Sequence, residues 1–305
     1  MRPRLGRPDI SAYRERFDVP PAGDGPAVTF LGVSSLLIDD GTSAILTDGY
    51  FSRPGMLRVG LGRIAPDPAR ITDVLTRTGI TSLDAVIPVH THFDHTLDSA
   101  DVAARTGAPL VGGTSAAQIG RGHGLPDDRI VTVTPAEPLT LGGFEVTFVP
   151  SHHCPPDRFP GVITAPVRTP ARASAFRCGD AWSILVRHNT SGRSVLIQGS
   201  AGHVAGALAG QEAEVAYLGV GQLGLQSEGY IETYWDETVR AVGARRAVLI
   251  HWDDFFRPLT EPLRALPYAG DDLDRTMRVL TRLADRNGVR LSFPTVFVRG
   301  NPWAT

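Results

Sequence analysis

The chain has 305 residues, and its 30 basic and 32 acidic residues give a formal net charge of -2. A chain of this length buries enough apolar surface to fold without disulfides or a structural metal, so any bound metal is free to act in catalysis. The charges are spread along the sequence without the basic concentration that a phosphate backbone attracts, which makes nucleic acid a disfavoured partner and a small molecule the expected one.

Three features of the sequence narrow the range of possible functions further. The chain contains no lysine, which excludes mechanisms that need a lysine Schiff base or a P-loop lysine. Its two cysteines, Cys154 and Cys178, are too few for a disulfide framework, and we expect both to be reduced thiols. Residues 1–20 lack an apolar leader, and no segment approaches 18 uninterrupted apolar residues, so we expect a cytoplasmic protein without a membrane span.

The first elements form a strand meander behind a polar lead. Residues 1–26 are rich in Pro and Gly, and no linker interrupts the chain after them, which predicts a lead segment 1–26 and a single domain 27–305. Short β-like runs predict strands at the positions 28–31, 34–38 and 44–47. A helical segment at 69–78 then precedes an apolar run of strand length at 84–89.

Helices and strands alternate through the middle of the chain. The pattern predicts helices at 97–106 and 115–121 and strands at 109–111, 129–133 and 144–149. Residues 155–179 are rich in Pro and Arg and show no period. Because long loops in compact domains are often functional, we interpret this segment as a lid.

The second half repeats the pattern of the first. Strands are predicted at 182–187, 195–198, 215–218, 247–250 and 290–298, and helices at 230–242 and 272–286. Two sets of strands with flanking helices predict an α/β protein, an αββα sandwich, although periodicity alone does not distinguish this from other α/β layer folds.

The strongest motif is the run His-Thr-His-Phe-Asp-His at residues 90–95, directly after a predicted strand. In an extended loop His90, His92 and Asp94 project to one side while His95 faces a neighbouring position, so the run can serve two adjacent metals. The pattern arises by chance in such a chain about once in a thousand, which disfavours the alternative of surface histidines in a turn.

This run resembles the H-x-H-x-D-H signature of the metallo-β-lactamase superfamily, and the resemblance extends over roughly residues 28–298. It implies the αββα sandwich of that fold. It also implies that Asp48, which ends the segment Ile45-Leu46-Thr47-Asp48, braces the metal loop.

The resemblance implies two further histidine ligands. One follows the segment Val149-Pro150-Ser151, where either His152 or His153 fits; we choose His153 on its spacing from the proline. The other is His251, which follows a late strand and precedes Trp252.

The implied ligand set falls into two groups. The metal ligands are His90, His92 and His153 for one site and Asp94, His95 and His251 for the other. Imidazole-rich ligation of this kind suits zinc, so we expect one or two zinc ions.

The chain departs from the family at Gly199-Ser200, where most hydrolytic members carry Gly-Asp with a carboxylate that bridges both metals. A subclass of metallo-β-lactamases carries Ser at this place and retains two zinc ions, so the departure does not imply inactivity. We assign catalytic roles to Asp94, which orients the attacking hydroxide or accepts its proton, and to Ser200.

The resemblance and the ligand chemistry together predict a zinc-dependent hydrolase. It would use a metal-bound hydroxide to cleave an ester, amide or lactam, or phosphodiester bond in a small molecule. One alternative is a mononuclear iron oxygenase of the same fold with two His and one Asp, which would be better served by Asp in place of Ser200. The other is a non-catalytic metal-binding or ligand-binding protein.

Overall fold

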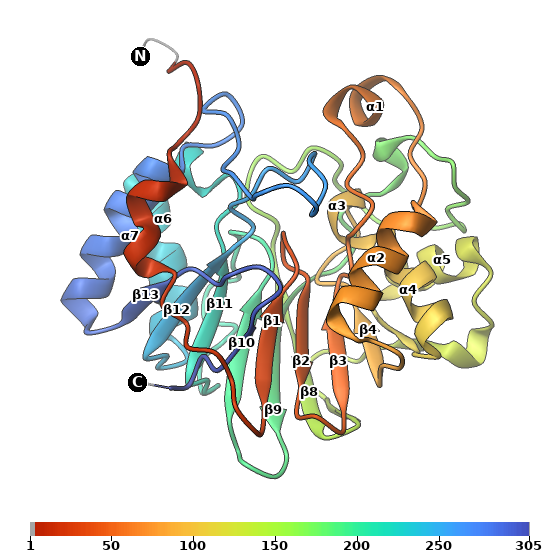
Figure 1. The fold of residues 1–305 in the computed structure, drawn as a ribbon, viewed down its shortest axis with the longest axis horizontal. Helices are drawn as coiled ribbons and strands as arrows, with labels where there is room; N and C mark the ends of the chain where they lie inside the picture. Colours follow the sequence, from red (N-terminus) through yellow and green to blue (C-terminus); the bar gives the residue numbers. More distant parts are fainter. Residues whose placement is uncertain (1–3, 305) are drawn as a thin grey trace.

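The computed structural model describes residues 4–304 and consists of two seven-stranded sheets packed face to face between layers of helices (Figure 1). One sheet has the order β14-β1-β2-β3-β4-β5-β6 and the other the order β13-β12-β11-β10-β9-β8-β7. The predicted αββα sandwich is therefore confirmed. Within the described residues no helix is both long enough and apolar enough to cross a membrane.

The first sheet combines an antiparallel meander with parallel strands. Its strands are β1 (Ala27–Phe30), β2 (Leu36–Asp39), β3 (Ala44–Thr47), β4 (Ala85–Ile87), β5 (Leu110–Gly112), β6 (Ile130–Thr132) and β14 (Arg299–Gly300). β1, β2 and β3 pair antiparallel, whereas β3, β4, β5 and β6 pair parallel. Parallel strands require crossover helices, and these lie on the outer face of this sheet.

The helices of the first half are α1 (Met56–Leu61), α2 (Pro68–Thr78), α3 (Phe93–Thr96), α4 (Ser99–Thr106) and α5 (Thr114–His123). α2 begins where the Asp67 carboxylate accepts the backbone N–H groups of Ala69 and Arg70. It ends at Gly79, which adopts the left-handed conformation. Its buried residues Ile71 and Val74 pack into the apolar core beneath the sheet.

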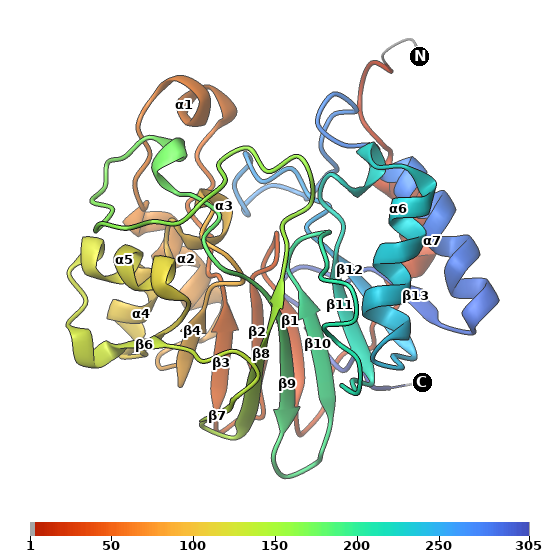
Figure 2. The ribbon, with the colours of Figure 1, turned by 180° about the vertical axis from the view of Figure 1, so that it is seen from behind.

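The second sheet contains β7 (Pro138–Leu141), β8 (Phe144–Ser151), β9 (Ala181–His188), β10 (Ser194–Gln198), β11 (Val215–Gly219), β12 (Arg246–Ile250) and β13 (Arg290–Ser292). The helices α6 (Glu228–Trp235) and α7 (Leu273–Asn287) cover its outer face (Figure 2). The Asp272 side chain accepts the backbone N–H of Arg275 at the start of α7. The apolar stripe of this helix, which includes Leu280 and Leu283, packs against the second sheet.

A third apolar cluster fills the space between the sheets. It contains Phe30 and Ile87 from the first sheet and Phe148, Ile184 and Ile250 from the second, all almost fully buried. The inner faces are thus sealed by side chains, which leaves the strand ends as the places where polar groups can gather.

Several predicted elements differ from the structure. The predicted strand 290–298 is too long: only its first residues form a strand, β13, which joins the second sheet. The chain then passes Pro294, and β14 pairs with β1 in the first sheet. The predicted helix 230–242 is α6 followed by a π-helical turn, η5 (Asp236–Arg240). The short elements α1 and β7 were not predicted.

Within the predicted lead 1–26, residues 1–3 lie outside the described part. The remainder contains a 3-10 helix, η1 (Ile10–Arg16), so this segment is more ordered than its composition indicated. Phe17, just after η1, stacks on Phe293 with ring centroids 5.2 Å apart. The separation of a lead from a single domain stays a prediction.

The topology gathers the predicted site residues at one end of the sandwich. β8, β10, β11 and β12 run in the same direction, as do β3 and β4 in the other sheet. The segment with His153 follows β8, Ser200 follows β10 and His251 follows β12, while Asp48 follows β3. Carboxyl ends of parallel strands are where α/β proteins place their ligands.

Candidate metal centre

The run 90–95 leaves β4 and enters the short helix α3. His92 occupies the position before the helix in an extended conformation, and Asp94 and His95 lie in its first turn. The Thr96 hydroxyl donates to the backbone oxygens of Thr91 and His92, which fixes the turn. All four ionisable side chains of the run are buried.

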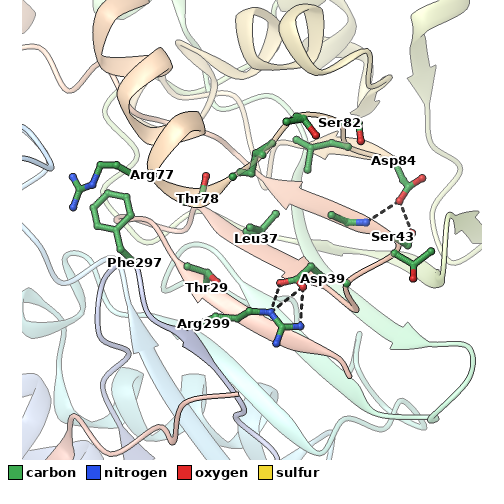
Figure 3. Close-up of a pocket in the computed structure, with 17 residues that line it drawn as sticks. Thr29, Leu37, Asp39, Ser43, Arg77, Thr78, Ser82, Asp84, Phe297 and Arg299 are labelled. Carbon is green, nitrogen blue, oxygen red and sulfur yellow. Dashed lines mark hydrogen bonds and ion pairs between the residues drawn. The ribbon is translucent and has the colours of Figure 1, made fainter. Parts of the chain in front are cut away.

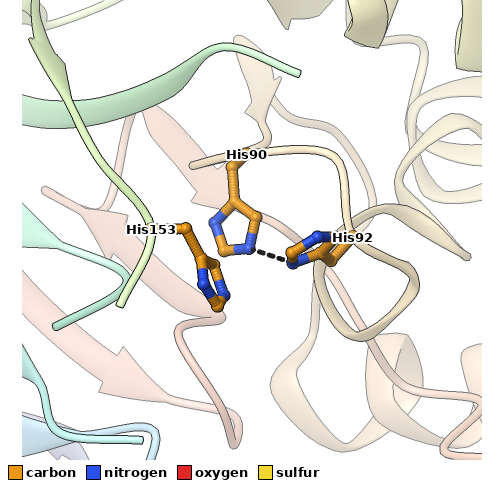
Figure 4. A group of neighbouring side chains, drawn as sticks. All are labelled: His90, His92 and His153. Carbon is orange, nitrogen blue, oxygen red and sulfur yellow. Dashed lines mark hydrogen bonds between the residues drawn. The ribbon is translucent and has the colours of Figure 1, made fainter. Parts of the chain in front are cut away.

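His90, His92 and His153 form one group (Figure 4). Nε2 of His90 lies 3.2 Å from Nδ1 of His92. The ring centroid of His153 lies 5.0 Å from that of His90 and 4.6 Å from that of His92. Nδ1 of His153 donates to the carbonyl oxygen of Cys154 at 2.7 Å, so Nε2 of His153 is left as an acceptor.

Asp94, His95 and His251 form a second group. The Oδ2 atom of Asp94 lies 3.8 Å from Nε2 of His95 and 3.5 Å from Nε2 of His251. The ring of His95 also lies 3.9 Å from that of His90, measured between centroids, so the two groups are adjacent. This arrangement matches the two predicted ligand groups residue for residue; that they hold metal ions stays a prediction.

The carboxylate of Asp48 holds the second group in place through hydrogen bonds. It is fully buried, and its Oδ2 atom accepts Nδ1–H of His95 at 2.8 Å and the hydroxyl of Ser34 at 2.6 Å. Its Oδ1 atom accepts the backbone N–H of Val89 at 2.9 Å, just before the run 90–95. Asp48 therefore holds both the ring of His95 and the backbone that leads to the ligands, as the resemblance implied.

The backbone of His251 is held by a buried ion pair that was not predicted. His251 has a φ of 57° and donates its N–H to the carbonyl oxygen of Val33 at 2.7 Å. The N–H of Val33 in turn donates to Asp253, whose other oxygen contacts the guanidinium of Arg53. Both charged side chains are fully buried. No local sequence signal joins two residues so far apart in the chain.

The chemistry of the two groups fits a metal ion. Nε2 of His95 is buried and has no hydrogen-bond partner among residues 4–304, which is the state of a nitrogen that faces an ion. Burial lowers the pKa of His90 well below its usual value and that of His153 to about 4, so both rings are neutral donors at pH 7. Burial alone would raise the pKa of Asp94, but the neighbouring His95 and His251 outweigh this effect and hold that pKa below its usual value, so the carboxylate is ionised.

Ser200 lies beside the groups but belongs to neither of them. Its Oγ atom accepts the backbone N–H of Cys154 at 3.0 Å, and its carbonyl oxygen accepts the hydroxyl of Tyr234 at 3.3 Å. The hydrogen bond between Ser200 and Cys154 fixes the segment that carries His153. A catalytic role for Ser200 stays a prediction.

The choice between the two adjacent histidines agrees with the geometry. His153 lies in the first group, whereas the side chain of His152 is exposed. Gly202 makes this arrangement possible, because a Cβ atom there would lie 2.0 Å from the carbonyl oxygen of His152. The assignment of His153 as a ligand stays a prediction.

The predicted lid 155–179 contains no strand and only one short 3-10 helix, η3 (Ala173–Ala175). Its first residues reach the metal centre: Oδ1 of Asp157 lies 3.1 Å from Nε2 of His92. Sequence reasoning missed Asp157, and the one signal for it was its place in a loop that directly follows His153.

A cavity of about 490 Å³ lies at the opposite end of the strands (Figure 3). Its charged groups are paired within the protein: Arg299 contacts Asp39, and Asp84 accepts the backbone N–H of Ala44 and contacts Ser43. None of the predicted ligands lines it. We therefore locate the functional site at the histidine groups.

An αββα sandwich with a histidine-rich centre at its strand ends defines the class of this protein. The model of the β-lactamase superfamily domain matches residues 44–252, which is more than half of the chain. The chain therefore belongs to this family. No curated protein matches the sequence.

Solved structures with low sequence identity share the fold. A protein from Veillonella parvula, described as a possible metal-dependent hydrolase, aligns with a TM-score of 0.56 at 14% identity over 92% of this chain and 98% of its own. Igni18, a metallo hydrolase from the archaeon Ignicoccus hospitalis, aligns with a TM-score of 0.53 at 15% identity over 90% of this chain and 96% of its own. CmlA, a diiron β-hydroxylase from Streptomyces venezuelae, aligns with a TM-score of 0.53 at 14% identity, over 91% of this chain and 54% of its own.

Proposed function

We propose that this protein is a zinc-dependent hydrolase that cleaves an ester, amide or lactam, or phosphodiester bond in a small molecule. The observation that carries the proposal is the pair of adjacent groups at the strand ends, one of three histidines and one of two histidines and an aspartate. Five imidazoles and one carboxylate form a set of ligands that suits zinc better than it suits magnesium or calcium.

When bound, zinc lowers the pKa of a coordinated water to about 7 and polarises the bond under attack. The residues of the chain prepare the site for this chemistry. Asp48 fixes the tautomer of His95 so that Nε2 faces the site. The ionised carboxylate of Asp94 lies between His95 and His251, where it can orient a water or accept its proton.

One observation favours a second candidate function, an iron-dependent oxygenase. Asp94, His95 and His251 are two histidines and one carboxylate, the ligand types that non-haem iron oxygenases use in a facial arrangement. The related fold of CmlA, a diiron hydroxylase, is compatible with iron but shows the fold alone. A purified protein that carries iron in place of zinc would favour this function.

The proposal is tested by zinc reconstitution followed by a panel of chromogenic substrates: an aryl ester, a cephalosporin and a bis-aryl phosphodiester. We expect hydrolysis of at least one substrate, and no turnover in His92→Ala and Asp94→Ala variants that keep the wild-type circular dichroism spectrum. Hydrolysis that persists in both variants would contradict the assignment. Zinc binding without hydrolysis of any substrate would favour a non-catalytic metal-binding protein.

A further inference from the structure

The ring of His92 has contacts on both of its nitrogens. Nδ1 faces His90 within the first group, at 3.2 Å from its Nε2 atom. Nε2 faces the opposite way, toward the loop 155–179, and lies 3.1 Å from Oδ1 of Asp157. A neutral imidazole ring carries a single N–H. A carboxylate at Nε2 places that proton on Nε2 and leaves the lone pair of Nδ1 for the first group.

Cys178, from the other end of the loop, lies near the same carboxylate. The ligand atoms of His92, Asp157 and Cys178 all lie within 4.8 Å of one another. Within the loop, Oδ1 of Asp157 accepts the backbone N–H of Phe159 at 2.9 Å. The Asp157 carboxylate thus contacts His92 of the metal centre and the backbone of its own loop at Phe159.

Backbone hydrogen bonds hold the two ends of the loop together beside His92. The N–H of Cys178 donates to the carbonyl oxygen of Phe159 at 2.9 Å. The carbonyl oxygen of Cys178 accepts the backbone N–H of Thr91 at 2.8 Å. The base of the loop is therefore held against the run 90–95. Two groups of the loop reach Nε2 of His92: the Asp157 carboxylate at 3.1 Å and the carbonyl oxygen of Phe159 at 3.4 Å.

We propose that Asp157 is a positioning residue for the metal centre. Its carboxylate fixes the ring of His92 for metal binding and holds the loop 155–179 closed over the metal centre. The proposal rests on the metal centre of the proposed function, and not on the bond that is cleaved. Metal binding and loop closure then share one contact, so loss of the carboxylate weakens both. The alternative interpretation of the cluster is a third metal site, which would require the His92 ring to be deprotonated on both nitrogens while Nδ1 binds in the first group.

The first measurement is the zinc affinity of the variants Asp157→Ala and Asp157→Asn, determined by competition with a chromogenic chelator. Loss of the carboxylate partner of a ligating histidine weakens metal binding by about 10- to 100-fold, which we expect for the alanine variant. The asparagine variant keeps an acceptor for Nε2–H without the charge, so we expect partial rescue. A purely structural role would not rank the variants in this order.

The second measurement is the rate of limited trypsin cleavage in the loop, which carries four exposed arginines: Arg158, Arg168, Arg172 and Arg177. We expect faster cleavage in Asp157→Ala than in the wild type, with and without zinc, and protection by zinc in the wild type. This readout needs neither activity nor a known substrate. If the wild type binds no zinc, the metal centre of the proposed function fails, while the cleavage rates still decide whether Asp157 latches the loop.

The matched control is Asp180→Ala, which removes a carboxylate two residues after Cys178 whose side chain contacts Thr114 and no predicted ligand in the described chain. We expect wild-type zinc affinity and wild-type cleavage at the four arginines. Wild-type values for both measurements in Asp157→Ala would overturn the proposal. A third equivalent of zinc that is lost in Cys178→Ser would also overturn it, because Asp157 would then be a ligand.

Discussion

The substitution Asp48→Asn tests whether one buried carboxylate organises the metal centre. Asp48 accepts three hydrogen bonds: from Val89 N–H on one oxygen, and from the Ser34 hydroxyl and His95 Nδ1–H on the other. Asparagine has one acceptor oxygen, so its amide group must face at least one of these donors. Because asparagine tolerates the φ of 53° at this position, the backbone conformation is kept.

The structure sets the size of the effect. One buried donor left without an acceptor costs about 1–3 kcal/mol, which we expect as the loss of unfolding free energy in the metal-free protein. The ring of His95 also loses its charged partner, so zinc affinity at the second group is expected to fall by about 10- to 100-fold. Urea unfolding in the presence of a chelator measures the first quantity, and chelator competition measures the second.

A suitable control is Asp84→Asn, because Asp84 accepts a backbone N–H at the opposite end of the strands, from Ala44. Both donors to Asp84, the Ser43 hydroxyl and Ala44 N–H, meet the same oxygen, so asparagine can keep them, and zinc affinity should be unchanged. Our reasoning about Asp48 would be refuted by a variant whose stability lies within about 0.5 kcal/mol of the wild type, as for an ordinary surface substitution, and whose zinc affinity is unaltered.

Three further predictions concern other parts of the site. Arg53→Ala leaves the buried carboxylate of Asp253 unpaired and should lower the unfolding free energy by about 3–5 kcal/mol in urea titrations; a wild-type midpoint would contradict this. Gly202→Ala places a Cβ atom 2.0 Å from the carbonyl oxygen of His152, so elemental analysis should find less bound zinc, and full occupancy would count against the expected displacement. Burial raises the pKa of Asp271 from 3.8 to about 7, so its contribution to stability is present at low pH and is lost as pH rises toward 7. Metal-free Asp271→Asn should therefore lose less stability than the wild type between about pH 4 and 7, and equal pH slopes would argue against the raised pKa.

The periodic parts of the fold were predictable from local sequence. α2, α4, α5 and α7 each bury one apolar stripe, and their limits follow from capping residues such as Asp67 and Gly79. The final segment was not predictable, because β14 is a two-residue strand whose place depends on pairing with β1, far away in the chain. Long-range pairing of this kind leaves almost no periodic signal.

In the candidate site, too, the features with a local sequence signal were predictable, and those that depend on distant partners were not. The run 90–95 could be found from its composition and spacing. The grouping of His153 and His251 with it came from the family resemblance. Asp157 and Arg53 could not be found in advance, since each acts through a partner distant in sequence. The sequence around Asp157, a loop rich in arginine, gives no signal of the contact that its side chain makes.

The measurement that tests the account most directly is the metal content of the purified protein, compared with that of His153→Ala and His251→Ala. These two residues belong to different groups, so each variant should disable one group and spare the other. We predict close to two zinc ions per chain in the wild type and a reduced content in both variants. Iron alone would contradict the zinc hydrolase, and the absence of bound metal after zinc reconstitution would contradict a metal centre at these residues.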